Sequence, residues 1–289
     1  MNQLISRLTR PALATLLALL GCGWTARAVN AQALLPYTLP LDEDRLTATG
    51  LSLAQEAAQL AQFQQYDEAL ARIQLAAQLA PRDPQILALM GSLHLQVGNS
   101  AAAVTALETA KSINSSDATI WFTLGSAYFS ESKYLQAANA LEKGLGLEPG
   151  NAGAHFDLGN AYYKLNRYEK AIDQYESAIG FNEAFWPAVN NIGLVLYEMG
   201  QLEPAIEQWE RSLNLSEEEP EPTLAIAAAQ YAANINRPAA ISAATAALER
   251  DSRYSDLEFL EDNLWGSRLL KAAETMFGTP RLQEVLSGL

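Results

Sequence analysis

The stretch from Ala152 to Asn182 reads AGAHFDLGNAYYKLNRYEKAIDQYESAIGFN, and it decides the fold. Its apolar residues recur at helical spacing in two segments, one from Phe156 to Tyr162 and one from Ala171 to Ile179. A short polar turn, Lys164 to Arg167, separates the two segments. The stretch therefore predicts two antiparallel helices joined by a tight turn.

The same pattern returns along the chain every 34 residues. Small residues form three columns with this period, which indicates a repeat whose helix backbones approach one another closely. The first column is Ala57, Gly91, Gly125, Gly159, Gly193 and Ala227, the second is Ala69, Ala103, Ala137, Ala171, Ala205 and Ala239, and the third is Ala76, Ala110, Gly144, Ala178, Ser212 and Ala246. The columns predict six units with no insertion between them.

The four glycines of the first column support the prediction of close packing. Glycine inside a helix costs about 1 kcal/mol relative to alanine. Such a cost is tolerated at four matching positions if the neighbouring helix leaves no room for a Cβ atom. We therefore expect a side chain larger than glycine at these positions to overpack the interface.

These residues resemble the tetratricopeptide-repeat (TPR) family, and the stretch quoted above is close to the repeat consensus. The resemblance covers six units and is looser in the first and last, where Glu56 replaces an apolar residue and Gln230 an aromatic one. It implies an all-α fold, a right-handed superhelical solenoid of antiparallel helix pairs. The expected units are 50–83, 84–117, 118–151, 152–185, 186–219 and 220–253.

Residues 254–289 depart from the period but keep apolar residues at helical spacing, among them Leu260, Trp265 and Leu269. The last repeat of a solenoid exposes an apolar face that needs a cover. The pattern predicts a C-terminal capping helix pair, with a separate docking element as the alternative. The tail also resembles the ends of small cyanobacterial TPR proteins associated with photosynthetic (thylakoid) membranes.

Residues 1–33 are typical of a signal peptide or membrane anchor. Arginines precede an uncharged run from Pro11 to Trp24, which is shorter than the roughly 20 residues of a membrane-spanning helix. Three interpretations stay open: cleavage after Ala33, lipid attachment to Cys22, or an uncleaved anchor. Each predicts a body exported across or anchored to a membrane, in the periplasm, the thylakoid lumen or at a membrane surface. Residues 34–49 are expected to form a linker.

Charge and composition exclude several function classes. The net charge is −14, and the only charges before Asp42 are three arginines, so the remainder of the chain carries −17. That field repels nucleic acid. The single cysteine allows no intramolecular disulfide. No catalytic motif is present, and His94 and His155 lack metal-ligand spacing, so we expect neither an enzyme nor a cofactor or metal site. The acidic run Glu217 to Pro222 is interpreted as a solvated turn.

In the TPR family the first helix of each pair lines an inner groove, and the resemblance places aromatic and polar residues there. Such side chains suit a protein or peptide ligand, although the rings could equally be ordinary packing residues. The expected groove residues are Phe122, Ser126, Phe129, Phe156, Asn160, Tyr163, Asn190, Tyr197 and Tyr231.

Some members of the family hold acidic chaperone tails with a clamp of groove lysines and asparagines. Asn160, Asn190 and Asn191 are present here, but the lysine positions hold Phe122, Thr123, Phe156 and Asp157. The resemblance therefore disfavours a chaperone tail and favours an aromatic or basic ligand.

The function expected from these features is a non-catalytic protein–protein interaction scaffold, exported or membrane-associated. Its sharper form is an assembly or stability factor for a membrane complex, photosynthetic if the chain is cyanobacterial. The alternatives are a self-associating structural protein, with Trp265 at the contact, and an accessory subunit of an enzyme.

Overall fold

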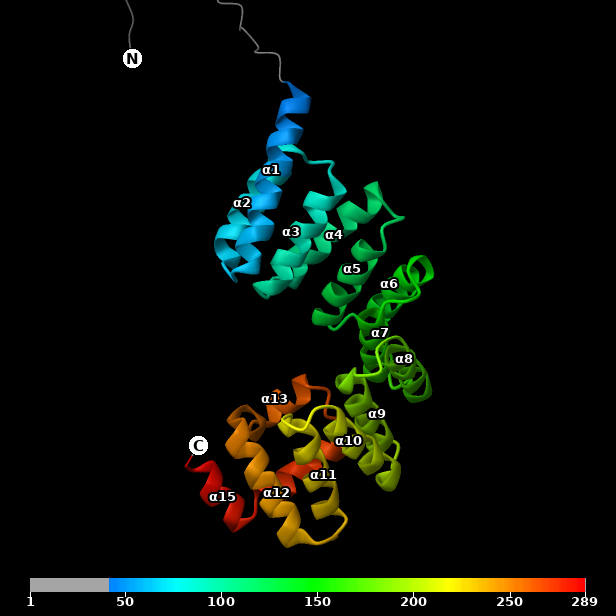
Figure 1. The fold of residues 1–289 in the computed structure, drawn as a ribbon, viewed down its shortest axis with the longest axis vertical. Coiled ribbons are helices and arrows are strands. Elements are labelled where there is room, and N and C mark those ends of the chain that lie inside the picture. Colours follow the sequence, from blue (N-terminus) through cyan, green and yellow to red (C-terminus); the bar gives the residue numbers. More distant parts are fainter. Residues whose placement is uncertain (1–41, 289) are drawn as a thin grey trace, which may run out of the picture. The chain divides into compact units, whose positions relative to one another are not determined.

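The computed structural model describes residues 42–288, and these fold into α-helices and one short 3-10 helix without any strand. Twelve of the helices form six consecutive antiparallel pairs (Figure 1). The pairs are α1 (Glu43–Gln62) and α2 (Tyr66–Leu79), α3 (Pro84–Gln96) and α4 (Ser100–Ile113), α5 (Ala118–Ser130) and α6 (Tyr134–Leu147), α7 (Ala152–Lys164) and α8 (Tyr168–Phe181), α9 (Trp186–Glu198) and α10 (Leu202–Leu215), and α11 (Pro220–Ala232) and α12 (Arg237–Arg250).

Local capping explains why the first helix of each unit begins where it does. The side chains of Asp83, Asp117 and Asn151 each accept hydrogen bonds from backbone N–H groups in the first turn of the helix that follows. Units five and six lack such a side-chain cap. They have proline in the first turn instead, where its missing N–H is not needed.

The glycine column lies where the two helices of a unit touch. A Cβ atom added to Gly91 or Gly125 would lie 2.5 Å from Cγ of Leu107 or Leu141. The same atom on Gly159 would lie 2.5 Å from the ring of Tyr175. In the fifth unit, Gly193 faces Trp209, whose Nε1 would be 2.5 Å away. The facing side chain, 16 residues after each glycine, thus fills the space that the absent Cβ leaves free.

Adjacent units are joined by hydrogen bonds as well as by apolar contacts. The hydroxyl of Tyr128 donates to Oε1 of Glu108 in the preceding unit at 2.5 Å. One repeat further along, Tyr162 donates in the same way to Glu142. The spacing of 20 residues is identical in the two pairs, so the contact repeats with the period of the sequence.

The predicted boundary between the linker and the first unit needs correction. Helix α1 begins at Glu43, so residues 43–49 are helical and do not belong to the predicted linker. The side chain of Asp42 caps this helix by accepting from the N–H of Arg45 at 3.1 Å. The acidic residues Asp42, Glu43 and Asp44 therefore lie at a helix start, where negative charge is favourable.

The prediction of six units without an insertion is wrong in the sixth. Five units join their helices by three-residue turns, whereas the turn between α11 and α12 has four residues. Buried positions in α12 are consequently Ala240 and Ala247, while Ala239 and Ala246 of the predicted columns are exposed. Asn234 and Asn236 both have positive φ in this turn, which asparagine tolerates better than most residues.

The C-terminal segment is more elaborate than the predicted helix pair. It contains a 3-10 helix (Ser252–Ser255) and three α-helices, α13 (Leu257–Asp262), α14 (Ser267–Phe277) and α15 (Pro280–Leu286). We call residues 252–288 the C-terminal module. Helix α14 packs against α11 and α9, the first helices of units six and five, and α15 packs against α12.

Alanine at Gly193 tests the close approach of α9 and α10. The added Cβ would collide with the fully buried ring of Trp209, so we expect a loss of about 1–3 kcal/mol in the free energy of unfolding in spite of the better helix propensity. Urea denaturation measures the change.

Gly180→Ala is the matched control, because nothing lies within 4 Å of a Cβ at Gly180 in α8. This change should stabilise the protein by up to about 1 kcal/mol through helix propensity alone. Equal stabilisation by both substitutions would contradict the packing described for Gly193.

Candidate protein-binding face

All nine predicted groove residues lie on the first helices of units three to six. Phe122, Ser126 and Phe129 are on α5, and α7 and α9 carry the central residues of the set. Tyr231 is on α11. Their burial divides them into two groups: Tyr163, Asn190 and Tyr197 are buried, whereas the other six are half-buried.

The half-buried group consists mainly of aromatic rings. The ring of Phe122 packs against Gly144, where a Cβ would lie 2.5 Å from it. The centroid of Phe129 is 5.2 Å from that of Tyr134, and the centroid of Phe156 is 5.2 Å from that of Phe185. Each ring is therefore packed against neighbouring side chains and still partly exposed to solvent. We call Phe122, Ser126, Phe129, Phe156 and Asp157 the open inner face.

A carboxylate lies among these rings. Ser126 donates a hydrogen bond from Oγ to Oδ2 of Asp157 at 3.1 Å, which links α5 to α7. Burial raises the pKa of Asp157 to about 6, against the opposing effect of the hydrogen bond from Ser126. The open inner face thus combines aromatic surface with one acceptor whose charge depends on pH near neutrality.

The amides predicted to bind ligand backbone are joined to each other. Oδ1 of Asn160 accepts from the hydroxyl of Tyr175 at 2.8 Å and from Nδ2 of Asn191 at 3.1 Å. Asn191 in turn accepts from Nδ2 of Asn190 at 3.3 Å. Asn190 is only 1% exposed. These amides align α7 with α9, and Asn190 is closed to a ligand.

The C-terminal module covers the inner face of units four to six. Nε1 of Trp265, a residue 2% exposed, donates to Oε1 of Glu221 on α11 at 3.1 Å. Glu198 on α9 accepts from the backbone N–H groups of Arg268 at 3.0 Å and Leu269 at 3.1 Å, and so caps α14. Glu221 thus fixes Trp265 to α11, and Glu198 fixes the start of α14 to α9.

This arrangement buries two of the predicted groove tyrosines. Tyr163 is 7% exposed and Tyr197 is 8% exposed. A Cβ added to Gly266 would lie 2.5 Å from Oη of Tyr163, so glycine permits the chain to pass close to this hydroxyl group. Tyr163 and Tyr197 therefore lie against the chain's own C-terminal module, and neither these tyrosines nor the buried Asn190 form part of an open groove.

Two interpretations of the sequence fail at the same place. Trp265 is buried and hydrogen-bonded, so it is not available for the self-association that its apolar surroundings suggested. The run Glu217 to Pro222 is not wholly a solvated turn, because Pro220, Glu221 and Pro222 are buried in the first turn of α11. Glu221 gave no distinct signal in the sequence, since its buried partner lies 44 residues away.

Comparison with known families supports the repeat assignment. Two models described as tetratricopeptide repeat match the chain, one over residues 122–189 and one over residues 84–117. These matches fall on the helix pairs of units two to four and continue into α9. Residues 84–117 and 122–189 are therefore tetratricopeptide repeats. No curated protein sequence matches it.

Solved structures of other TPR proteins share the fold. A crystal structure of MamA is similar with a TM-score of 0.52 and 24% sequence identity, covering 56% of this chain and 94% of MamA. MamA from Desulfovibrio magneticus RS-1 gives a TM-score of 0.55 at 20% identity over 58% of this chain and 96% of its own. TTC0263, a TPR protein of Thermus thermophilus, gives 0.51 at 20% identity over 62% and 98%. At these identities the likeness concerns the fold.

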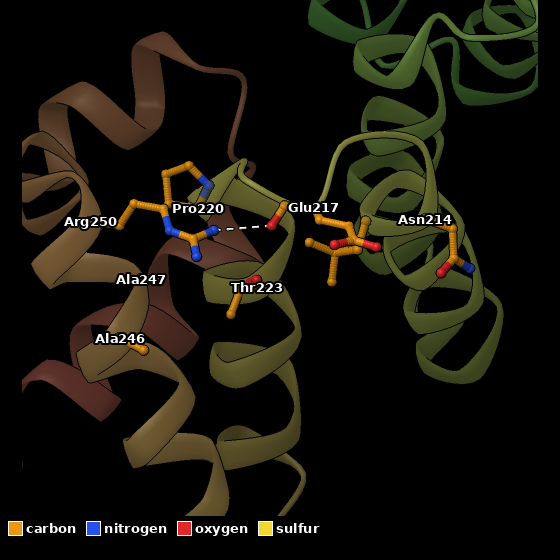
Figure 2. A pocket seen from close by; sticks show the side chains of 8 residues that line it. Asn214, Glu217, Pro220, Thr223, Ala246, Ala247 and Arg250 are labelled. Atoms are coloured by element: carbon orange, nitrogen blue, oxygen red, sulfur yellow. Dashed lines mark hydrogen bonds between the residues drawn. The ribbon is translucent and has the colours of Figure 1, made fainter.

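A hollow of about 290 Å³ also lies between α10, α11 and α12 (Figure 2). Arg250 crosses it and donates from Nη1 to the carbonyl oxygen of Glu217 at 3.0 Å. The contact fixes the turn between units five and six to the last helix of the array. The acidic turn therefore has a structural partner within the chain.

Within residues 42–288, no group of three or more His, Cys, Asp or Glu residues is arranged to hold a metal ion. No helix in that part of the TPR chain combines the length and apolar character needed to span a bilayer. The predicted cleavage site after Ala33 and the predicted lipid attachment at Cys22 lie outside the described residues.

Glu221→Gln tests the buried carboxyl beneath the C-terminal module. Burial raises the pKa of Glu221 to about 7 from 4.5, although hydrogen bonds from Trp265 and Asn190 act in the opposite direction. The folded state therefore holds a proton that the unfolded state releases between pH 4.5 and 7, so stability falls as the pH rises through this window. Glutamine keeps an acceptor for Trp265 and removes this loss.

At pH 8 the free energy of unfolding of the variant should exceed that of the wild type by at most about 3 kcal/mol, since each pKa unit corresponds to about 1.36 kcal/mol. At pH 5 the two proteins should be nearly equally stable. Thermal unfolding across this pH range measures the difference. Glu218→Gln removes an equal charge from the exposed part of the same turn and should leave the pH profile unchanged. Parallel profiles for wild type and Glu221→Gln would show that Glu221 does not titrate there.

Proposed function

We propose that this TPR protein is a non-catalytic scaffold that binds a protein ligand on its open inner face. The observation that carries the proposal is the set of half-buried rings of Phe122, Phe129 and Phe156, which the C-terminal module leaves uncovered. Aromatic rings contribute large contact area at interfaces, and an extended peptide can bond neighbouring polar groups.

The chemistry of this face favours a ligand segment with basic or aromatic side chains. Asp157 offers a carboxylate among the rings, and the chain from Asp42 onward carries 33 acidic against 16 basic residues. A negative surface attracts a positively charged segment and speeds its association. The groove lysines that would hold an acidic tail are replaced here by Phe122, Thr123 and Phe156.

The proposed location is outside the cytoplasm or at a membrane surface, and the proposed role is assembly or stabilisation of a membrane complex. Support comes from residues 1–33, whose basic, apolar and small-residue regions are typical of an export signal or anchor. The resemblance of the tail to cyanobacterial thylakoid-associated TPR proteins makes a photosynthetic complex the specific form of this proposal.

Removing two rings tests the open inner face. Phe129→Ala/Phe156→Ala should lose proteins that the wild-type chain captures from extracts of its own cells, because the apolar contact area is gone. Quantitative mass spectrometry of cross-linked captures measures each protein's recovery.

Leu135→Ala/Phe181→Ala is the matched control, since these side chains are 51% and 56% exposed and lie on the second helices of units three and four. The control should retain every captured protein. Unchanged recovery with the Phe129/Phe156 variant, provided it unfolds at a temperature close to that of the control, would place binding elsewhere.

The mature N-terminus tests the proposed export. Intact-mass spectrometry of the protein purified from its own cells should show a chain that begins after Ala33, because that site follows the apolar run at the position expected for signal cleavage. A lipid-modified Cys22 at the N-terminus would instead indicate anchoring. A chain that retains Met1 and fractionates away from every membrane would contradict both.

A further inference from the structure

A hollow of about 540 Å³ lies beside the C-terminal module, where the end of α9, the turn between α11 and α12, and helix α14 meet. Three of its lining residues are basic: Arg237, Arg268 and Lys271. The others are neutral, among them Tyr197, and none is acidic. We call this hollow the basic pocket.

The charge of the basic pocket is opposite to that of the rest of the protein. From Asp42 onward acidic residues outnumber basic ones by 33 to 16. A random part of this surface would therefore be lined mainly by carboxylates. Three cations around one hollow, one from α12 and two from α14, instead create a local positive potential, which the low-dielectric walls of a concave site strengthen.

Aromatic rings hold the two guanidinium groups in place. The guanidinium of Arg268 lies over the ring of Tyr197, 5.6 Å from its centroid, and that of Arg237 lies over the ring of Tyr231, 4.5 Å from its centroid. Nε of Arg237 also donates to the carbonyl oxygen of Tyr231 at 3.1 Å. These contacts restrict the planes of both groups, so less side-chain freedom is lost when an anion binds.

The two guanidinium groups form no ion pair within the described part of the chain. No carboxylate oxygen of residues 42–288 lies within 4.0 Å of either guanidinium. Glu198 is nearby, but its carboxylate accepts from the backbone of Arg268 and Leu269. Lys271 pairs with Glu274 at 2.7 Å across an exposed surface, where such pairs are weak.

We propose that the basic pocket binds an acidic segment of a partner protein, with carboxylates of that segment accepting from Arg237, Arg268 and Lys271. Guanidinium groups offer paired N–H donors that match a carboxylate. The volume suits two or three side chains. The inference rests on the proposed scaffold function and assigns a second contact surface to it, formed by residues of α12 and α14.

Polyanions fit the pocket less well than a short acidic segment. A nucleic acid or an anionic membrane would extend beyond the hollow over a surface of the same sign as itself, and the repulsion would oppose binding. A peptide that carries a few carboxylates can place them in the pocket and continue with neutral residues. The local and not the overall charge then decides binding.

The test uses the full chain and a fluorescein-labelled peptide of eight residues in which glutamate alternates with alanine and serine. Fluorescence polarisation at low salt should show binding that weakens as salt increases, because exposed charges are screened. The matching peptide with glutamine for glutamate should bind at least about tenfold more weakly, since it lacks the charge.

Arg237→Gln/Arg268→Gln should weaken binding of the glutamate peptide at least about tenfold. The control Arg82→Gln/Arg211→Gln removes two exposed arginines outside the pocket, and its affinity for the peptide should stay within about twofold of the wild type. Equal loss in both variants would mean that diffuse charge binds the peptide, and no binding to the wild type would also overturn the proposal. Similar unfolding temperatures establish that the variants are folded.

Two further measurements test whether the basic pocket binds lipid headgroups instead and whether it acts independently of the open inner face. Phosphatidylserine vesicles that sediment the wild type but not Arg237→Gln/Arg268→Gln would assign the pocket to lipid headgroups and overturn the peptide proposal. Phe129→Ala/Phe156→Ala should bind the acidic peptide as the wild type does. If Phe129→Ala/Phe156→Ala loses captured proteins but still binds the acidic peptide, the open inner face and the basic pocket bind different ligands. Failure of one proposal can therefore be distinguished from failure of the other.

Discussion

The close approach of paired helices at the glycine column is the constraint on which the rest of the structure depends. At Gly91, Gly125, Gly159 and Gly193, a Cβ would come within 2.5 Å of the facing side chain. Because the two helices of a unit meet at this distance, the first helices of successive units can line one face and the second helices the other. The inner face, its aromatic rings and its amide contacts all follow from that separation into two layers.

Much of the fold could be predicted from the sequence, because a repeat presents the same information several times. The period of 34 residues and the small columns indicate helix pairs, and helices α3, α5, α7, α9 and α11 begin at the predicted unit boundaries. The inserted residue before α12 was not predicted. Alanine is so frequent in that unit that the predicted columns remain occupied by alanine in either register.

The candidate site was harder to predict because it depends on contacts distant in the sequence. The resemblance to the TPR family places Phe122, Phe156 and Tyr163 on the inner helices, but it carries no information on which of them the C-terminal module covers. That cover depends on Glu198 and Glu221, two carboxylates whose partners lie about 70 and 44 residues further along. A single sequence does not show which distant positions are in contact. Because acidic residues are common in this chain, Glu198 and Glu221 also do not stand out from the others.

The four-residue turn between α11 and α12 has a consequence for how this chain can vary. The extra residue lengthens the turn, Asn236 absorbs it with a left-handed backbone conformation, and the buried face of α12 is re-formed one position later. A change in chain length that would disrupt a helix interior is thus confined to a solvent-exposed connection. The turns within the units are accordingly the places where natural insertions, or an engineered reporter sequence, can enter the array while its helices stay packed.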